Sequence, residues 1–81
     1  MDYNSYNESL DRLKYFFRMR VKDPDYLKEL NEIIEGSRKK KTVAIRAIHQ
    51  KYIEYLKGST DGVVKIEGED EMWMELLHAW Q

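Results

Sequence analysis

The chain has 81 residues, 42% of them hydrophobic and 36% charged, with a formal net charge of −1 and no cysteine. A chain of this length holds one hydrophobic core, and its composition is too apolar for a disordered protein. It has no apolar run of the ~18 to 20 residues that span a membrane, no signal-peptide pattern, and no thiol for disulfides, zinc ligation or catalysis. We therefore expect a single cytoplasmic domain over residues 1–81.

Charge alternates in blocks along the chain. Residues 12–22 carry five cations and no acid, and residues 36–57 carry seven cations against one glutamate. The last block, residues 58–81, has six acids against one lysine. Blocks of opposite sign attract each other within a fold, whereas a nucleic-acid-binding protein is more often basic throughout. The pattern favours a structural use of these charges.

The first predicted helix covers about residues 5–21. Ser5 followed three residues later by Glu8 has the form of a capping box, which marks a helix start. Behind it, apolar side chains recur every three to four residues, which is the spacing of an amphipathic helix. This stripe consists of Tyr6, Leu10, Leu13, Phe17 and Val21.

The second predicted helix covers about residues 24–35. Asp23 is suited to cap it, and Pro24 has the fixed φ that fits the first helical position. Gly36 fits the left-handed residue that often ends a helix, so the sequence predicts a stop there. The apolar face of this helix contains Leu27, Leu30, Ile33 and Ile34.

The third predicted helix covers about residues 42–57, after the basic segment GSRKKKT (residues 36–42). A start at Ser37 would put four cations in the first turn, where the helix dipole repels them. Thr42 is therefore the predicted N-cap and Gly58 the predicted end, which leaves the cations in a solvated connection. The apolar face contains Ile45, Ile48, Tyr52, Ile53 and Leu56.

The last quarter of the chain contains two further elements. Residues 62–67 hold a β-branched run between turn signals, which predicts a short β-strand or hairpin. Residues 69–80 begin with acids and end near His78, an arrangement that suits the dipole of a helix. The sequence thus predicts a mainly α fold, a small helical bundle of three to four helices with that short strand in addition.

Catalytic and metal-binding patterns are missing from the sequence. His49 and His78 have no cysteine, no second histidine at helical spacing and no carboxylate at a characteristic ligand interval. The acidic run from Glu67 to Glu71 lacks the alternating oxygen ligands and central glycine of a calcium loop. No nucleophile-elbow, P-loop or dinucleotide-binding glycine motif occurs. We expect a protein that is not an enzyme and holds no cofactor or metal.

Nucleic-acid binding is the alternative function. The second and third helices, with the basic segment between them, resemble the helix-turn-helix pattern of bacterial repressors, whose recognition helix often begins with Ser or Thr followed by Val. The resemblance implies phosphate contacts from the lysines and base contacts from the third helix, although the connection is longer than the tight turn of that motif. The residues of this alternative are Arg38, Lys39, Lys40, Lys41, Thr42, Arg46 and Gln50.

Protein binding is the function that the sequence favours. Tyrosine and tryptophan combine an apolar body with a polar tip, which suits interfaces. Four of the six tyrosines lie on or beside the apolar stripes, which leaves Tyr3 as the foremost contact. Trp73 and Trp80 either close the core, which a small domain favours, or leave an apolar patch for a partner. We expect an interaction or regulatory protein with Tyr3, Trp73 and Trp80 as partner contacts, and the sequence also allows a homodimer.

Overall fold

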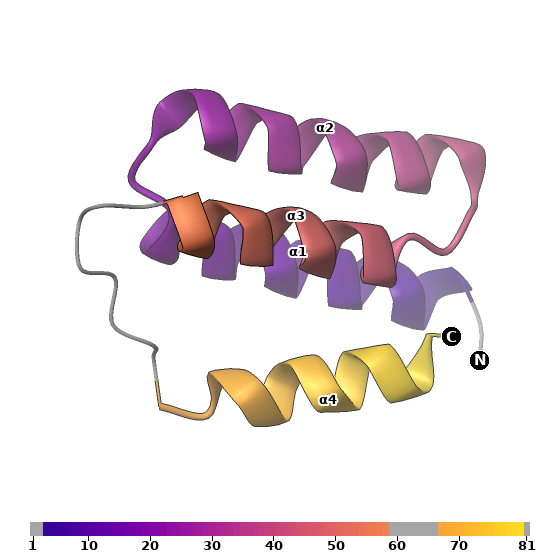
Figure 1. Cartoon of the computed structure of the whole chain (residues 1–81). Coiled ribbons are helices and arrows are strands. Elements are labelled where there is room, and N and C mark those ends of the chain that lie inside the picture. Colours follow the sequence, from indigo (N-terminus) through magenta and orange to yellow (C-terminus); the bar gives the residue numbers. More distant parts are fainter. Residues whose placement is uncertain (1–2, 59–66, 81) are drawn as a thin grey trace. The chain divides into compact units, whose positions relative to one another are not determined.

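The computed structural model describes residues 3–58 and 67–80, and its four α-helices confirm the mainly α-helical class. Within those residues there is no β-strand, and nearly all of the strand predicted at 62–67 lies outside them. The backbone contacts divide the chain into two units, Met1–Ala44 and Ile45–Gln81, each with one pair of helices (Figure 1). One domain over residues 1–81 therefore stays a prediction. None of the described helices has the length and apolar character needed to cross a membrane.

The first unit is a hairpin of two helices, α1 (Tyr3–Arg20) and α2 (Pro24–Lys40), which contact each other and run in opposite directions (Figure 1). α1 begins two residues before its predicted start, so Ser5 lies inside the helix and does not cap it. The predicted apolar stripe is confirmed, because all five of its side chains are buried. The stripe is the inner side of the hairpin, and the charged residues of α1 lie largely outside it.

The N-terminus of α2 forms as predicted. Asp23 has an extended backbone, with φ of −77° and ψ of 114°, and its side chain caps the helix. Its Oδ1 accepts hydrogen bonds from the amides of Asp25 at 3.0 Å and Tyr26 at 3.4 Å. Pro24 follows at the start of the helix, where its missing N–H leaves no helical hydrogen bond unmade.

The C-terminus of α2 lies well beyond the predicted one. The helix passes through Gly36, takes residues 38–40 into its last turn, and ends at Lys41 in the left-handed conformation (φ 55°, ψ 40°). Cations in a last turn interact favourably with the negative end of the helix dipole. Together with the burial of Ser37, this gain outweighs the roughly 1 kcal/mol that glycine costs inside a helix. The predicted stop at Gly36 and the predicted solvated connection are therefore wrong.

A cluster of hydroxyl groups fixes the chain where it leaves α2. The Ala44 amide donates to Tyr6 Oη at 2.9 Å, and Tyr6 Oη lies 2.7 Å from the buried Ser37 Oγ. The Ser37 hydroxyl donates its own proton to the Thr42 carbonyl. Because a hydroxyl has one proton, the Tyr6 hydroxyl must then be the donor to Ser37 Oγ. One tyrosine of α1 thereby holds both the end of α2 and the segment that follows it.

The predicted N-cap at Thr42 is also wrong. The next helix begins at Ile45, and residues 42–44 are not helical. Their backbone groups are used elsewhere, because the Thr42 amide donates to the Ser37 carbonyl at 3.1 Å and the Ala44 amide donates to Tyr6. Tertiary hydrogen bonds therefore set this boundary, and the local capping preference of threonine does not.

The second unit contains α3 (Ile45–Gly58) and α4 (Glu69–Ala79), which contact each other and also run in opposite directions (Figure 1). Tyr52 Oη donates to Oε2 of the buried Glu69 at 2.9 Å, and the Tyr52 ring stacks on Trp73 with centroids 5.7 Å apart. This hydrogen bond gives the buried carboxyl group a partner. α3 ends at Gly58, one residue beyond its predicted range, and α4 ends one residue before its predicted end.

We predict that Tyr6→Phe lowers the free energy of unfolding by about 1 to 3 kcal/mol, because the Ala44 amide loses its acceptor and Ser37 Oγ loses the proton donated by Tyr6. Urea unfolding followed by circular dichroism measures this change. Tyr15→Phe is the matched control, since the Tyr15 side chain is exposed and its variant should stay within about 0.5 kcal/mol of the wild type. Equal midpoints for the two variants would contradict the role of the Tyr6 hydroxyl.

Candidate interaction surfaces

Arg38, the first cation of the basic segment, is held by acids of its own unit. Its Nη2 lies 2.7 Å from Asp11 Oδ1 on α1, and its Nε lies 3.3 Å from Glu35 Oε2. Lys14 also donates to Glu35, at 2.8 Å, and this hydrogen bond lowers the pKa of Glu35 while partial burial opposes the shift. Arg38 is thus part of an ion-pair network between α1 and α2.

The other members of the predicted nucleic-acid set are exposed. Lys39 and Lys40 lie in the last turn of α2, Lys41 ends it, and the Thr42 side chain follows in the non-helical segment. Thr42 is therefore not at a helix N-terminus, where the predicted N-cap would place it. Arg46 and Gln50 are exposed on α3, in the second unit, so the set is divided between the two units.

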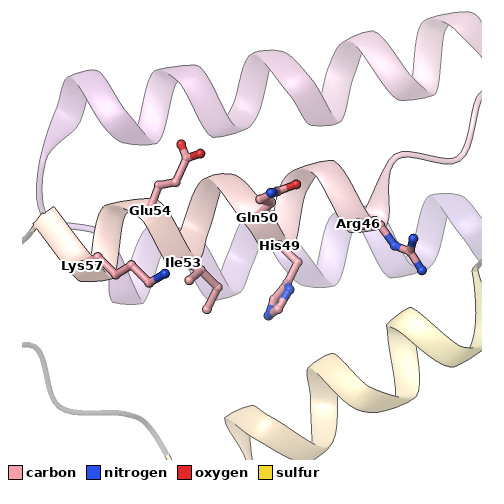
Figure 2. Close-up of a pocket in the computed structure, with 6 residues that line it drawn as sticks. All are labelled: Arg46, His49, Gln50, Ile53, Glu54 and Lys57. Atoms are coloured by element: carbon pink, nitrogen blue, oxygen red, sulfur yellow. The ribbon is translucent and has the colours of Figure 1, made fainter.

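One face of α3 lines a hollow of about 480 Å³. The lining side chains recur at helical spacing, and Figure 2 shows Gln50 and Glu54 directed away from His49 and Ile53. Cations stand at both ends of this face and a carboxylate lies between them, so the hollow has no uniform charge. The lining residues are Arg46, His49, Gln50, Ile53, Glu54 and Lys57.

His49 is the half-buried ionisable group of this face. Its ring lies 4.7 Å from the Trp73 ring, measured between centroids. Burial lowers the pKa of His49, and the negative charge of Glu69 acts against that shift. Within the described ranges, no group of three or more His, Cys, Asp or Glu residues is placed to hold a metal ion.

The predicted partner contacts divide between the core and the surface. Trp73 is 3% exposed and packs on Tyr52 and His49, so the placement of Trp73 on a partner-binding surface is wrong. Trp80 is half-buried and forms the C-cap of α4. Tyr3 is the first residue of α1, and its side chain lies outside what the structure describes.

The outer face of α1 was not singled out from the sequence. Tyr15 is 66% exposed and Met19 is 60% exposed, and the two lie four residues apart on the same side of the helix. Arg12 and Arg18 are exposed beside them. We call Arg12, Tyr15, Arg18 and Met19 the α1 outer face. A signal for it was present, because Tyr15 and Met19 fall outside the apolar stripe that begins at Tyr6.

A second exposed face lies on α4. Met74 is 72% exposed, and the acidic residues around it are exposed as well. Asp70 and Glu71 lie four and three residues before Met74, and Glu75 lies four residues after Glu71, so neighbouring pairs connect all four residues along this side of the helix. We call Asp70, Glu71, Met74 and Glu75 the α4 outer face.

Comparison with known proteins adds no assignment. The chain matches no protein-family model, no curated protein and no solved structure.

We predict that His49 makes the protein less stable at acidic pH. Because the pKa of His49 in the folded state is below its ordinary value, the unfolded state takes up the proton first as pH falls. Stability is therefore lost below the ordinary pKa, and urea midpoints measured at about pH 8 and about pH 5.5 should report the loss. His49→Gln should reduce this difference, whereas the exposed His78→Gln should keep it. An unchanged difference in His49→Gln would contradict the prediction.

Proposed function

We propose that this chain is a small non-enzymatic interaction protein that binds another protein through the α1 outer face. The observation that carries the proposal is the pair of large apolar side chains, Tyr15 and Met19, exposed on one side of one helix. Single exposed apolar residues are ordinary on protein surfaces, whereas Tyr15 and Met19 are neighbours at a spacing of four residues on one helix.

The composition of the α1 outer face supports this proposal. Aromatic residues, methionine and arginine are enriched in protein interfaces, and tyrosine and arginine are frequent among the residues that contribute most to binding. Here Arg12 and Arg18 lie within one turn of Tyr15. The face therefore offers apolar contact area together with hydrogen-bond donors at its edge.

The hairpin holds this face in a fixed orientation. Leu13 and Phe17 are buried on the opposite side of α1, and the ion pairs from Lys14 to Glu35 and from Arg38 to Asp11 join the helix to α2. A helix that is held in this way does not have to be ordered on binding, which lowers the entropic cost of association. Exposed ion pairs contribute only about 0 to 1 kcal/mol each, so the buried stripe supplies most of this restraint.

The proposal of a non-enzymatic role is supported by the way the polar groups of the interior are used. The buried Glu69 accepts a hydrogen bond from Tyr52, and the buried Ser37 is bonded to Tyr6 and to the Thr42 carbonyl. His49 faces an aromatic ring. Each of these groups has a structural partner, so none needs a substrate to explain its position.

We predict that a photo-crosslinking amino acid at position 15 forms a covalent adduct with a protein partner in cells. The same amino acid at position 32, an exposed site on α2, is the matched control and should form no such adduct. Adding Met19→Glu to the position 15 variant should weaken the adduct severalfold, since a charge then replaces apolar contact area. Adducts of equal yield at both positions, or none at position 15, would contradict the proposed surface.

Nucleic-acid binding is the second candidate, and the exposure of Lys39, Lys40 and Lys41 is the observation in its favour. Their position at the carbonyl end of α2 weighs against it, because that end of a helix dipole repels phosphate. If this candidate is correct, the protein should retard DNA or RNA at low salt, and changing the three lysines to glutamine should abolish the retardation. Wild-type protein that shows no salt-sensitive shift would exclude it.

A further inference from the structure

We infer that the partner of the α1 outer face is the α4 outer face of a second copy of this chain. The inference rests on the proposed function for the binding role of α1 and adds the identity of the partner. Two observations lead to it: both faces expose large apolar side chains, and the charges around those side chains are opposite in sign.

The two faces are complementary in charge. On α1, Arg12 and Arg18 flank Tyr15, the neighbouring Asp11 is paired with Arg38, and Glu8 lies one turn before Arg12. The α4 outer face carries three acids, and His78 lies one turn after Met74. Contact between two α1 faces, or between two α4 faces, would bring like charges together, which is unfavourable. Contact between α1 of one copy and α4 of the other brings opposite charges together, so charge selects this pairing.

The apolar side chains of the two faces are suited to pack on each other. Met74 stands between Asp70 and Glu75 on α4, while Tyr15 stands between Arg12 and Arg18 on α1. A methionine side chain is unbranched and adapts to its neighbours, and its sulfur makes favourable contacts with aromatic rings. Packing Met74 against the other copy's Tyr15 and Met19 would cover the three most exposed large apolar side chains of the described residues.

The length of the faces also agrees. Arg12 to Met19 spans about 10 Å along α1, and Asp70 to Glu75 spans about 8 Å along α4, at 1.5 Å per residue. The α1 outer face therefore covers about two helical turns and the α4 outer face about one and a half. A contact of this size is smaller than the ~800 Å² per partner of a standard interface. The association therefore belongs with the small, weak and transient protein contacts, and it is sensitive to salt.

The contact uses different surfaces on the two copies. If the α1 outer face of each copy contacts the α4 outer face of the other, two copies form a closed two-fold dimer with two such contacts. If the rotation that relates one copy to the next does not form a closed ring, further copies add head to tail. The assembly mass distinguishes these two forms, and both contain the same contact.

The experiment is analytical ultracentrifugation of the whole chain over a wide concentration range. At about 50 mM salt the average mass of the wild type should rise at least 1.5-fold with concentration, and about 500 mM salt should reduce that rise severalfold. Arg12→Glu with Arg18→Glu, and separately Glu71→Lys with Glu75→Lys, should each stay monomeric. A mixture of these two variants should associate again, because the exchanged charges still match.

Controls separate the contact from folding and from net charge. Lys28→Glu with Arg46→Glu makes the same charge change as the arginine variant, on exposed positions of α2 and of the first turn of α3, and should keep the wild-type association. Met74→Ser changes no charge, and it should weaken association severalfold without loss of helicity by circular dichroism. This variant keeps the test valid if cations in the first turn of α4 prevent folding.

Three results would overturn the inference: a wild type that stays monomeric at millimolar concentration, self-association that Met74→Ser leaves unchanged, and a mixture of folded charge-exchanged variants that does not associate.

A different set of results would contradict the proposed function. Adducts in cells from position 15 to another protein, with a monomeric purified chain, would retain the proposed function and reject a second copy as the partner. Absence of any adduct from position 15, in cells or in purified protein, would reject both.

Discussion

The hydroxyl group of Tyr6 connects three parts of the first unit. It accepts the Ala44 amide and donates to Ser37, so α1, the end of α2 and the segment after α2 share one buried polar cluster. Buried polar groups are costly unless they are bonded, and each proton in this cluster has an acceptor. The cluster therefore specifies one arrangement of the hairpin, whereas the apolar stripe alone would tolerate small shifts of the two helices.

The positions of the surface features follow from this arrangement. With Tyr6 and Phe17 directed inward, the helical repeat directs Tyr15 and Met19 outward, where they form the α1 outer face. The lysines that follow Ser37 complete the last turn of α2, where they stabilise the negative end of the helix. The most conspicuous basic run of the chain thus has a structural role, and the less conspicuous α1 outer face is the stronger candidate for binding.

The features that depend on helical periodicity were predicted correctly from the sequence. The helix boundaries that depend on long-range hydrogen bonds were not. The buried stripe of α1 and the cap at Asp23 follow from spacing and from local chemistry, and both are confirmed. The end of α2 was predicted wrongly at Gly36. The helix continues past this glycine because Ser37 is hydrogen-bonded to Tyr6, a residue distant in the chain. The burial of Trp73 was open in the sequence, since a tryptophan on a short helix suits either a core or an interface. The periodicity places Tyr15 outside the stripe, but it does not distinguish an exposed interface tyrosine from a solvated one.

The most direct test of the account is amide hydrogen exchange of Ala44, measured by NMR. Ala44 precedes α3, so its amide has no helical carbonyl to bond. The hydrogen bond to Tyr6 is therefore what protects this amide from exchange. The account predicts slow exchange in the wild type and at least about 10-fold faster exchange in Tyr6→Phe, which corresponds to the loss of one hydrogen bond. Exchange of the Ala44 amide at the unprotected rate in the wild type would contradict the central role of this cluster.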